Sequence, residues 1–458
     1  METRIKPRDA GNFAEGSVRS NILRLALPMT VAQLINLLYS VVDRAFLARM
    51  PGAGTTALTS VGLVLPIISI LLSVASLCGT GGAPLFSISR GRGDDTEAGK
   101  ILGNAFCLLL IFGAALTAAV VLFMKPILYA FGASEDTYPY GAEYLTVYTA
   151  GTIFVMISLG MNSFINAQGA AKRGTLTIAI GAAINIVLDP IFIFVLGLGV
   201  TGAALATVIA QLASATWVML YLCRGAAIRL RLSNMRLKAS RVGKIITLGL
   251  SGFCMQLTNS LIQIVCNRTL RAYGGDLYIG VMTVINAVRE IVFMPVSGVA
   301  AGATPVLGFN FGAKQYARVK EAIRFSAKVT VIYTICIWAA ILAAPYIFMR
   351  IFTNDTALIA AGMRAMRLYF ACGVFMSLQM SSQQVFVALG KSKQAVFFSL
   401  LRKVFLSAPL TIALPYLGMG TDGVFLADTI SQLLGGLLCG GTMFFTLYKK
   451  LDKNASES

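Results

Sequence analysis

An aspartate and an asparagine interrupt one of the most apolar stretches of this chain. In "AINIVLDPIFIFVLGLG" (183–199), Asn185 and Asp189 are four residues apart, and Pro190 follows at once. Side chains at i and i+4 share one face of a helix. A carboxylate at the centre of a bilayer costs about 2.5–3.5 kcal/mol on insertion scales, so acidic residues there mark ion or substrate pathways. The proline should loosen the preceding carbonyl ladder and offer further oxygen ligands to a small cation.

A second polar stripe lies near the start of the chain. Asn36, Tyr39 and Asp43 are spaced i, i+3 and i+7, and Gln33 extends the same face by one turn. Pro28 in the same helix removes one backbone donor, so a bend is expected there.

These two stripes together predict a site that binds a proton or a cation. Two neighbouring carboxylates repel each other when both are ionised, so Asp43 and Asp189 are favoured with one shared proton or with a bound cation. A proton requires one carboxylate, whereas Na⁺ requires several oxygens at once. The residues alone allow H⁺ or Na⁺.

The elements that must position these residues are membrane-spanning helices. The chain has 458 residues, of which 57% are hydrophobic and 12% charged, against about 25% charged in soluble domains. Its apolar runs are long enough to cross a hydrocarbon core of about 30 Å as helices. The pattern predicts an all-α integral membrane protein with twelve transmembrane helices, near residues 20–47, 57–83, 100–123, 143–168, 175–196, 200–223, 245–267, 278–304, 326–347, 365–388, 394–416 and 423–447.

The net charge of +19 is explained by topology. Lys and Arg gather in the N-terminal segment and in alternate loops, such as 224–244, while the loops between hold few. This pattern follows the positive-inside rule and predicts two cytoplasmic termini in the plasma (inner) membrane. A nucleic-acid partner is therefore not expected, and the lipid bilayer is the expected surroundings. The chain has no histidine, and none of its eight cysteines forms a CxxC pair, so no metal centre or cofactor is expected.

The second half of the chain repeats the first. "LGLGVTGAALA" (196–206) aligns with "LGMGTDGVFLA" (417–427) at an offset of 221. Six helices per half give both halves the same orientation, as in parallel-repeat transporters. We expect two pseudo-symmetric six-helix lobes around a central cavity: an N-lobe at 1–223, a cytoplasmic basic linker at 224–244 and a C-lobe at 245–458.

The repeat also indicates candidate residues in the second half. Gln256 and Asn259 correspond to Gln33 and Asn36 at an offset of 223. Glu290 lies deep in a predicted helix. We expect Gln33, Asn36, Tyr39, Gln256, Asn259 and Glu290 to contact substrate. Asp428, Arg402 and Lys403 are also buried in predicted helices, and for each the alternative is a structural ion pair.

The whole chain resembles the multidrug and toxic compound extrusion (MATE) transporters. The resemblance rests on "LALPMTVAQLINLLYSVVDRAFLARM", "INIVLDPIFIF", "LGLGVTGAALATVIAQ" and "PVLGFNFGAK". It implies a secondary active exporter, not an enzyme, that exchanges organic and mostly cationic compounds for inward H⁺ or Na⁺ by alternating access. It also implies a cation-coupling site at Asp43, Asn185, Asp189 and Thr207. One branch of the family uses an acid in helix 7, where this chain has Cys266 and Asn267.

Two other functions are weighed against this interpretation. A lipid-linked precursor flippase of the same superfamily would use basic cavity residues, for which Arg289, Arg402 and Lys403 are candidates. A membrane enzyme is disfavoured because no nucleophile–base pair stands out. The expected partner is a small-molecule drug or toxic organic cation, and the chain is expected to act as a monomer.

Overall fold

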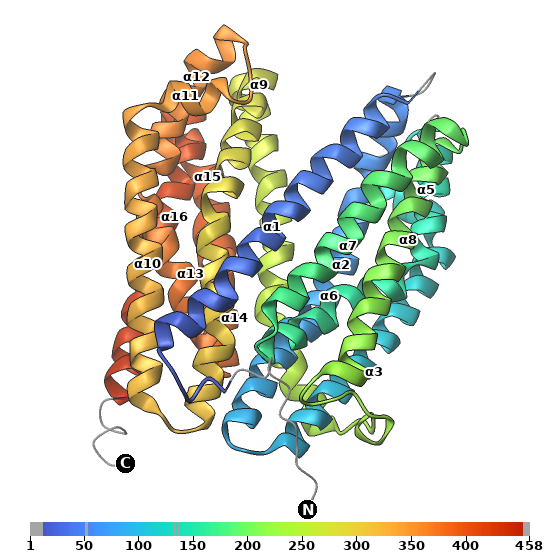
Figure 1. Cartoon of the computed structure of the whole chain (residues 1–458). Coiled ribbons are helices and arrows are strands. Elements are labelled where there is room, and N and C mark those ends of the chain that lie inside the picture. The colour runs from blue at the N-terminus through green and yellow to red at the C-terminus, as the bar shows by residue number, and fades with distance from the viewer. Residues whose placement is uncertain (1–11, 51–53, 132, 136, 452–458) are drawn as a thin grey trace, which may run out of the picture. The chain divides into compact units, whose positions relative to one another are not determined.

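A computed structural model describes residues 12–50, 54–131, 133–135 and 137–451 of the chain. Almost all of these residues are helical, and none of them forms a strand (Figure 1). The all-α prediction is therefore confirmed for the part of the chain that the structure describes.

The chain folds into two compact units. One contains residues 27–249, and the other contains residues 13–26 together with those from 250 onward. The division within the first helix falls between Ala26 and Leu27, next to Pro28.

The first unit is a bundle in which α2 packs on α3 and α6, and α8 packs on α5, α6 and α7. Figure 1 shows α7 and α8 side by side. Its elements are α1 (Val18–Ala48) from Leu27 onward, α2 (Gly54–Gly91), α3 (Asp95–Leu122), α4 (Met124–Ala130), α5 (Tyr138–Ala150), α6 (Thr152–Ala167), α7 (Ala171–Pro190), the π-helix η1 (Ile191–Val195), α8 (Gly199–Leu220), the π-helix η2 (Tyr221–Gly225) and the 3₁₀ turn η3 (Leu232–Asn234).

In the second unit α16 packs on α12, α13 and α15, and α10 packs on α13. Its elements are α9 (Ala239–Gly312), α10 (Tyr316–Ala343), α11 (Pro345–Arg350), α12 (Thr356–Phe370), α13 (Gly373–Ala388), α14 (Ser392–Leu400), the π-helix η4 (Leu401–Ser407), α15 (Ala408–Leu414), the π-helix η5 (Pro415–Met419), α16 (Gly420–Met443) and the π-helix η6 (Phe444–Tyr448).

The described helices account for twelve membrane spans. Eight segments are long and apolar enough to cross a bilayer, and the bent pairs α5–α6 (56°) and α12–α13 (46°) supply two more. Two of the eight are long enough for two spans each. The 74-residue α9 is interrupted at Gly275, where φ is 65°, and the 60-residue segment Ser392–Leu451 is interrupted at Gly418, where φ is 93°. Glycine adopts such positive φ angles without steric cost.

The predicted helix ranges differ from the structure mainly at two kinds of place. The helices expected at 143–168 and 365–388 are each broken by a bend, which hydrophobicity alone does not reveal. The helix expected at 57–83 continues to Gly91, because its last turns contain Ser87, Ser89 and Arg90 and so fall outside an apolar window.

The basic segment 224–244 packs on the first unit. Asn104 of α3 donates through Nδ2 to the Arg236 carbonyl oxygen (3.0 Å) and accepts from the Lys238 amide (3.0 Å). Arg241 forms a two-point ion pair with Glu97, with N–O distances of 2.7 and 2.8 Å. These contacts join the segment to the cytoplasmic end that the charge pattern predicts for α3.

The first turns of α9 also approach α2 closely. A Cβ atom on Gly249 would overlap the Leu77 carbonyl, and one on Gly81 would overlap the Ile245 carbonyl. Small residues let two helix backbones meet in this way. The close crossing explains why α9 as far as Gly249 belongs to the first unit.

Candidate functional site

The first unit contains a partly open cavity of about 630 Å³. Its walls come from α1, α2, α5, α6, α7 and α8. The polar residues that line it are Gln33, Asn36, Tyr39, Ser40, Asp43, Ser69, Tyr144, Tyr148, Ser158, Asn162, Thr177, Asn185, Thr207, Gln211 and Ser214.

Three of the predicted coupling residues meet at one end of this cavity. Asn185 donates through Nδ2 both to Asp189 Oδ1 (3.2 Å) and to Thr207 Oγ1 (3.2 Å). All three side chains are buried, and Asp189 is fully enclosed (0% exposed). The amide therefore links the carboxylate of α7 to the hydroxyl of α8.

The carboxyl groups of Asp43 and Asp189 lie against each other within hydrogen-bonding reach. The second Asp189 oxygen, Oδ2, is buried and receives no hydrogen bond from any described residue. The same holds for Asn185 Oδ1. Two carboxylates have no proton of their own to share, so their contact requires an added proton or cation.

Tyrosines complete the wall around the pair. The side chains of Tyr39 and Tyr144 both lie beside Thr207. Tyr144 and Tyr148 are buried and their rings stack, with centroids 6.1 Å apart. The sequence prediction missed these two residues, although their i, i+4 spacing within an apolar segment was a usable signal.

The local sequence explains why α7 and α8 meet at this point. Pro190 ends α7, and the π-helix η1 follows, with the Leu196 amide bonded to the Ile191 carbonyl (2.9 Å). Gly197 and Gly199 then adopt positive φ angles of 64° and 55°, which reverse the chain into α8. Residues of α7 that precede Pro190 therefore face residues of α8, which follows the turn.

The first helix is also tied to α7. The Thr175 hydroxyl donates to the Pro28 carbonyl oxygen at 2.7 Å. From this anchor the stripe of Gln33, Asn36 and Tyr39 runs along the cavity wall to Asp43. The structure therefore brings together all the residues predicted for the site in the first half of the chain.

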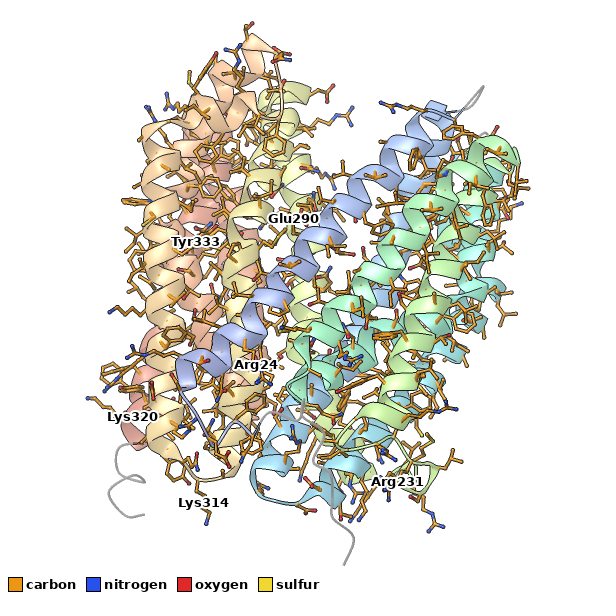
Figure 2. The ribbon with its side chains drawn as sticks, in the orientation of Figure 1. Arg24, Arg231, Glu290, Lys314, Lys320 and Tyr333 are labelled. Atoms are coloured by element: carbon orange, nitrogen blue, oxygen red, sulfur yellow. The ribbon has the colours of Figure 1, made fainter. Side chains whose placement is uncertain are left out.

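The predicted residues of the second half lie elsewhere. Gln256 and Asn259 are on α9, exposed and half-buried respectively, in the second unit. Glu290 is exposed and projects from a later turn of α9 (Figure 2). None of these three lines the cavity of the first unit. Within the described residues no group of three His, Cys, Asp or Glu side chains could hold a metal ion.

Comparison with known proteins identifies relatives over the full length of the chain. The multidrug export protein MepA of Staphylococcus aureus (strain NCTC 8325) is 22% identical over 449 residues, which are 97% of each chain. MepA of Staphylococcus haemolyticus is 24% identical over 351 residues, or 76% of each chain.

Solved structures share the fold. The crystal structure of MATE in the bent conformation has a TM-score of 0.91 and 22% identity, and covers 97% of this chain and 98% of its own. The outward-facing conformation of a multidrug resistance MATE family transporter has a TM-score of 0.90 and 21% identity, with 99% and 100% covered.

The sequence model of the MatE family matches two stretches, residues 28–191 and 253–413. One match falls in each half of the chain, as the internal repeat requires. Together the matches cover more than half of the residues. They confirm the predicted resemblance and place the chain among membrane transporters, not enzymes. The chain is a member of the MATE family.

Proposed function

We propose that this chain is a secondary active multidrug exporter, which moves organic cations out of the cell in exchange for inward H⁺ or Na⁺. It would act by alternating access, as a monomer in the plasma membrane and without a cofactor. The export function named for the MepA relatives supports this proposal. Several apolar spans and membership of the MATE family support a multi-pass membrane protein.

The observation that carries the proposal is the contact between Asp43 and Asp189 at the end of the cavity of the first unit. A proton placed between the two carboxyl groups would turn a repulsive contact into a hydrogen bond. Na⁺ would instead use several oxygens, and Asp43, Asp189, Asn185 and Thr207 each offer one. Either ion would be transported as cargo at this site.

The cavity wall supports a cationic substrate. Asp43 supplies an acidic group, and none of the described lining residues is basic. The aromatic rings of Tyr39, Tyr144 and Tyr148 offer faces that attract cations. A drug cation and a coupling ion would then compete for the same carboxylates.

The flippase alternative depends on basic residues that lie away from this cavity. Arg402 and Lys403 are buried in η4 of the second unit, where Lys403 Nζ lies 3.8 Å from Asp428 Oδ1. The cavity of the first unit therefore offers no positive wall to a pyrophosphate group. This observation favours an exporter of cations.

Transport by the purified chain in liposomes tests the proposal. A fluorescent organic cation should move when a pH gradient or a Na⁺ gradient is imposed across the membrane, and the two gradients should be applied separately to identify the ion. Counterflow of radiolabelled candidate substrates, at fixed pH with and without Na⁺, supplies an independent measurement. Movement of a lipid-linked precursor in place of the cation would favour the flippase.

We further propose that both termini and the segment 224–244 face the cytoplasm, as the Lys and Arg pattern indicates. Figure 2 shows Lys314 and Lys320 together at one end of the second unit, with Tyr333 farther along α10. These lysines belong to one of the loops expected in the cytoplasm.

Cysteine labelling tests this topology. In a cysteine-free background, a membrane-impermeant thiol reagent applied to intact cells should label Ser134→Cys and leave Leu232→Cys unlabelled. Both positions are exposed in the structure, so burial would not explain a difference between them. Permeabilised cells, in which both should react, are the control. The reverse accessibility would overturn the topology.

A further inference from the structure

The structure of the second unit preserves the register of the internal repeat. In the first unit Asn162 Nδ2 donates to the Gly174 carbonyl oxygen (3.2 Å). In the second unit Gln383 Nε2 donates to the Ala395 carbonyl oxygen (3.5 Å). Both donor and acceptor are displaced by 221 residues, the offset of the sequence repeat. The offset of 221 therefore holds where α7 packs on α6 and where α14 packs on α13, and Pro84 with Pro305 and Gly91 with Gly312 show the same offset at the ends of α2 and α9.

The same crossing of two helices recurs at Arg402. In the first unit a Cβ atom on Gly181 would lie 2.6 Å from Ser214 Oγ. The equivalent pair is Arg402 and Gly435, where a Cβ atom on Gly435 would lie 3.2 Å from Arg402 Cγ. Arg402 therefore occupies the position that is equivalent to Gly181, which lines the cavity of the first unit.

Two more lining positions become basic in the second unit. Ala182 lines the cavity of the first unit, and its equivalent is Lys403. Ile68 also lines that cavity, and its equivalent is Arg289. Three neutral positions have thus been replaced by three cationic side chains, which reverses the charge of the site.

One buried acid, Asp428, lies among these bases, and several groups donate hydrogen bonds to it. Asp428, the equivalent of Thr207, is 4% exposed and accepts from Gln432 Nε2 at 2.9 Å and from Ser407 Oγ at 3.3 Å. Lys403 Nζ lies 3.8 Å from Asp428 Oδ1. The carboxylate of Asp428 therefore balances the positive charge of Lys403. The positive charges of Arg289 and Arg402 remain.

The two arginines differ in their surroundings. Arg289 is half-buried, lies beside Tyr369 and interacts with the neighbouring, exposed Glu290. Arg402 is 8% exposed, and its Nη1 atom is buried with no hydrogen-bond acceptor among the described residues. A buried charged donor without a partner is costly. One positive charge in the cluster thus lacks a counter-charge.

We propose that this cluster of the second unit, formed by Arg289, Arg402, Lys403, Asp428 and Gln432, binds one small monovalent anion of halide or carboxylate chemistry. The anion accepts from Arg402 Nη1 and balances the charge that Asp428 within the cluster and Glu290 at its edge leave on the three bases. Arg289 is half-buried and Glu290 is exposed at the edge of the cluster. The inference depends on the repeat and on this cluster, and it does not require the proposed export function.

Anion binding is measured on the full-length chain in lipid nanodiscs by equilibrium dialysis. Radiolabelled chloride and radiolabelled acetate are the two probes, in a buffer whose other anion is gluconate. We expect saturable binding of one anion per chain. Chloride binding that acetate does not displace would identify a halide site. Acetate binding that chloride does not displace would identify a site for the carboxylate of an organic molecule. Binding of neither probe by the folded chain would overturn the proposal.

Variants connect the binding to the cluster. Arg402→Gln removes the charged donor and should weaken binding by more than about tenfold, since hydrogen bonds to charged groups contribute about 1.5–3 kcal/mol. Arg271→Gln, a change to an exposed arginine of the same unit, should leave binding unchanged.

Asp428→Asn provides a test of opposite sign. It removes the acid that competes for the bases, so anion affinity should rise. A merely structural ion pair would give no such gain. Thermal unfolding and size-exclusion chromatography identify any variant that fails to fold, and unchanged binding in a folded Arg402→Gln chain would exclude the assigned site.

Discussion

Asp189→Asn and Asp43→Asn should each abolish efflux that is driven by an ion gradient. Both changes keep the shape of the side chain but remove the ionisable group, so the contact between the two carboxyl groups no longer takes up a proton or a cation. Asn185 can still donate to the amide oxygen at position 189 and to Thr207. We therefore expect folding and expression to be retained, and efflux to fall to the level of cells without the transporter.

Glu143→Gln is the matched control for these variants. Glu143 is an exposed acid of the same unit, bonded to Thr201 at 3.3 Å and outside the cavity. Its variant should transport normally. Efflux assays in cells, with the amount of protein measured by immunoblot, compare the three variants. Efflux at the unaltered rate in both aspartate variants would remove the first unit as the place of coupling.

Binding of a permanently charged organic cation should weaken as the pH falls from about 8 to about 5.5. The drug and the proton both require the carboxylates of Asp43 and Asp189, so protonation removes the charge that attracts the drug. Displacement of one proton changes the apparent Kd by up to about tenfold per pH unit. Tyr39, Tyr144 and Thr207, which surround the pair, carry no charge that would reverse this sign. Fluorescence titration of the detergent-solubilised chain measures the dependence.

Asp43→Asn should flatten this pH dependence, because one of the two competing groups is then unable to titrate. A Kd that stays constant across the range in the unaltered chain would show that drug and proton do not share the carboxylates. Coupling would then have to act indirectly, through a bend at Pro28 or through repacking of the helices. In that case Glu290 becomes the better candidate for holding the charge of the drug.

The stoichiometry of exchange has a separate electrical consequence. Moving one charge across 100 mV is worth about 2.3 kcal/mol. Exchange of one proton for one monovalent cation moves no net charge and depends on the pH gradient alone. Exchange of two protons, one on each aspartate, would gain the voltage contribution as well.

The fold class and much of the site in the first unit follow from the amino-acid sequence. Long apolar runs predict membrane-spanning helices. In hydrocarbon, a helix satisfies the backbone hydrogen bonds of a segment within that segment itself. Helical spacing placed Asn36, Tyr39 and Asp43 on one face, since that geometry is local. An acid among apolar residues identified Asp189 because burial of charge is costly wherever the helix packs. The repeat, too, needed only the sequence.

Contacts between residues of different helices became known from the folded structure alone. The bends between α5 and α6 and between α12 and α13 leave no mark in hydrophobicity. The approach of Asn185 to Thr207 follows from the chain reversal at Gly197 and Gly199. The buried Arg402 beside Asp428 and Lys403 likewise depends on how η4 packs against α16. Spacing along one helix determines which residues share a face of that helix. Which helix packs against that face depends on contacts between segments that are far apart in sequence.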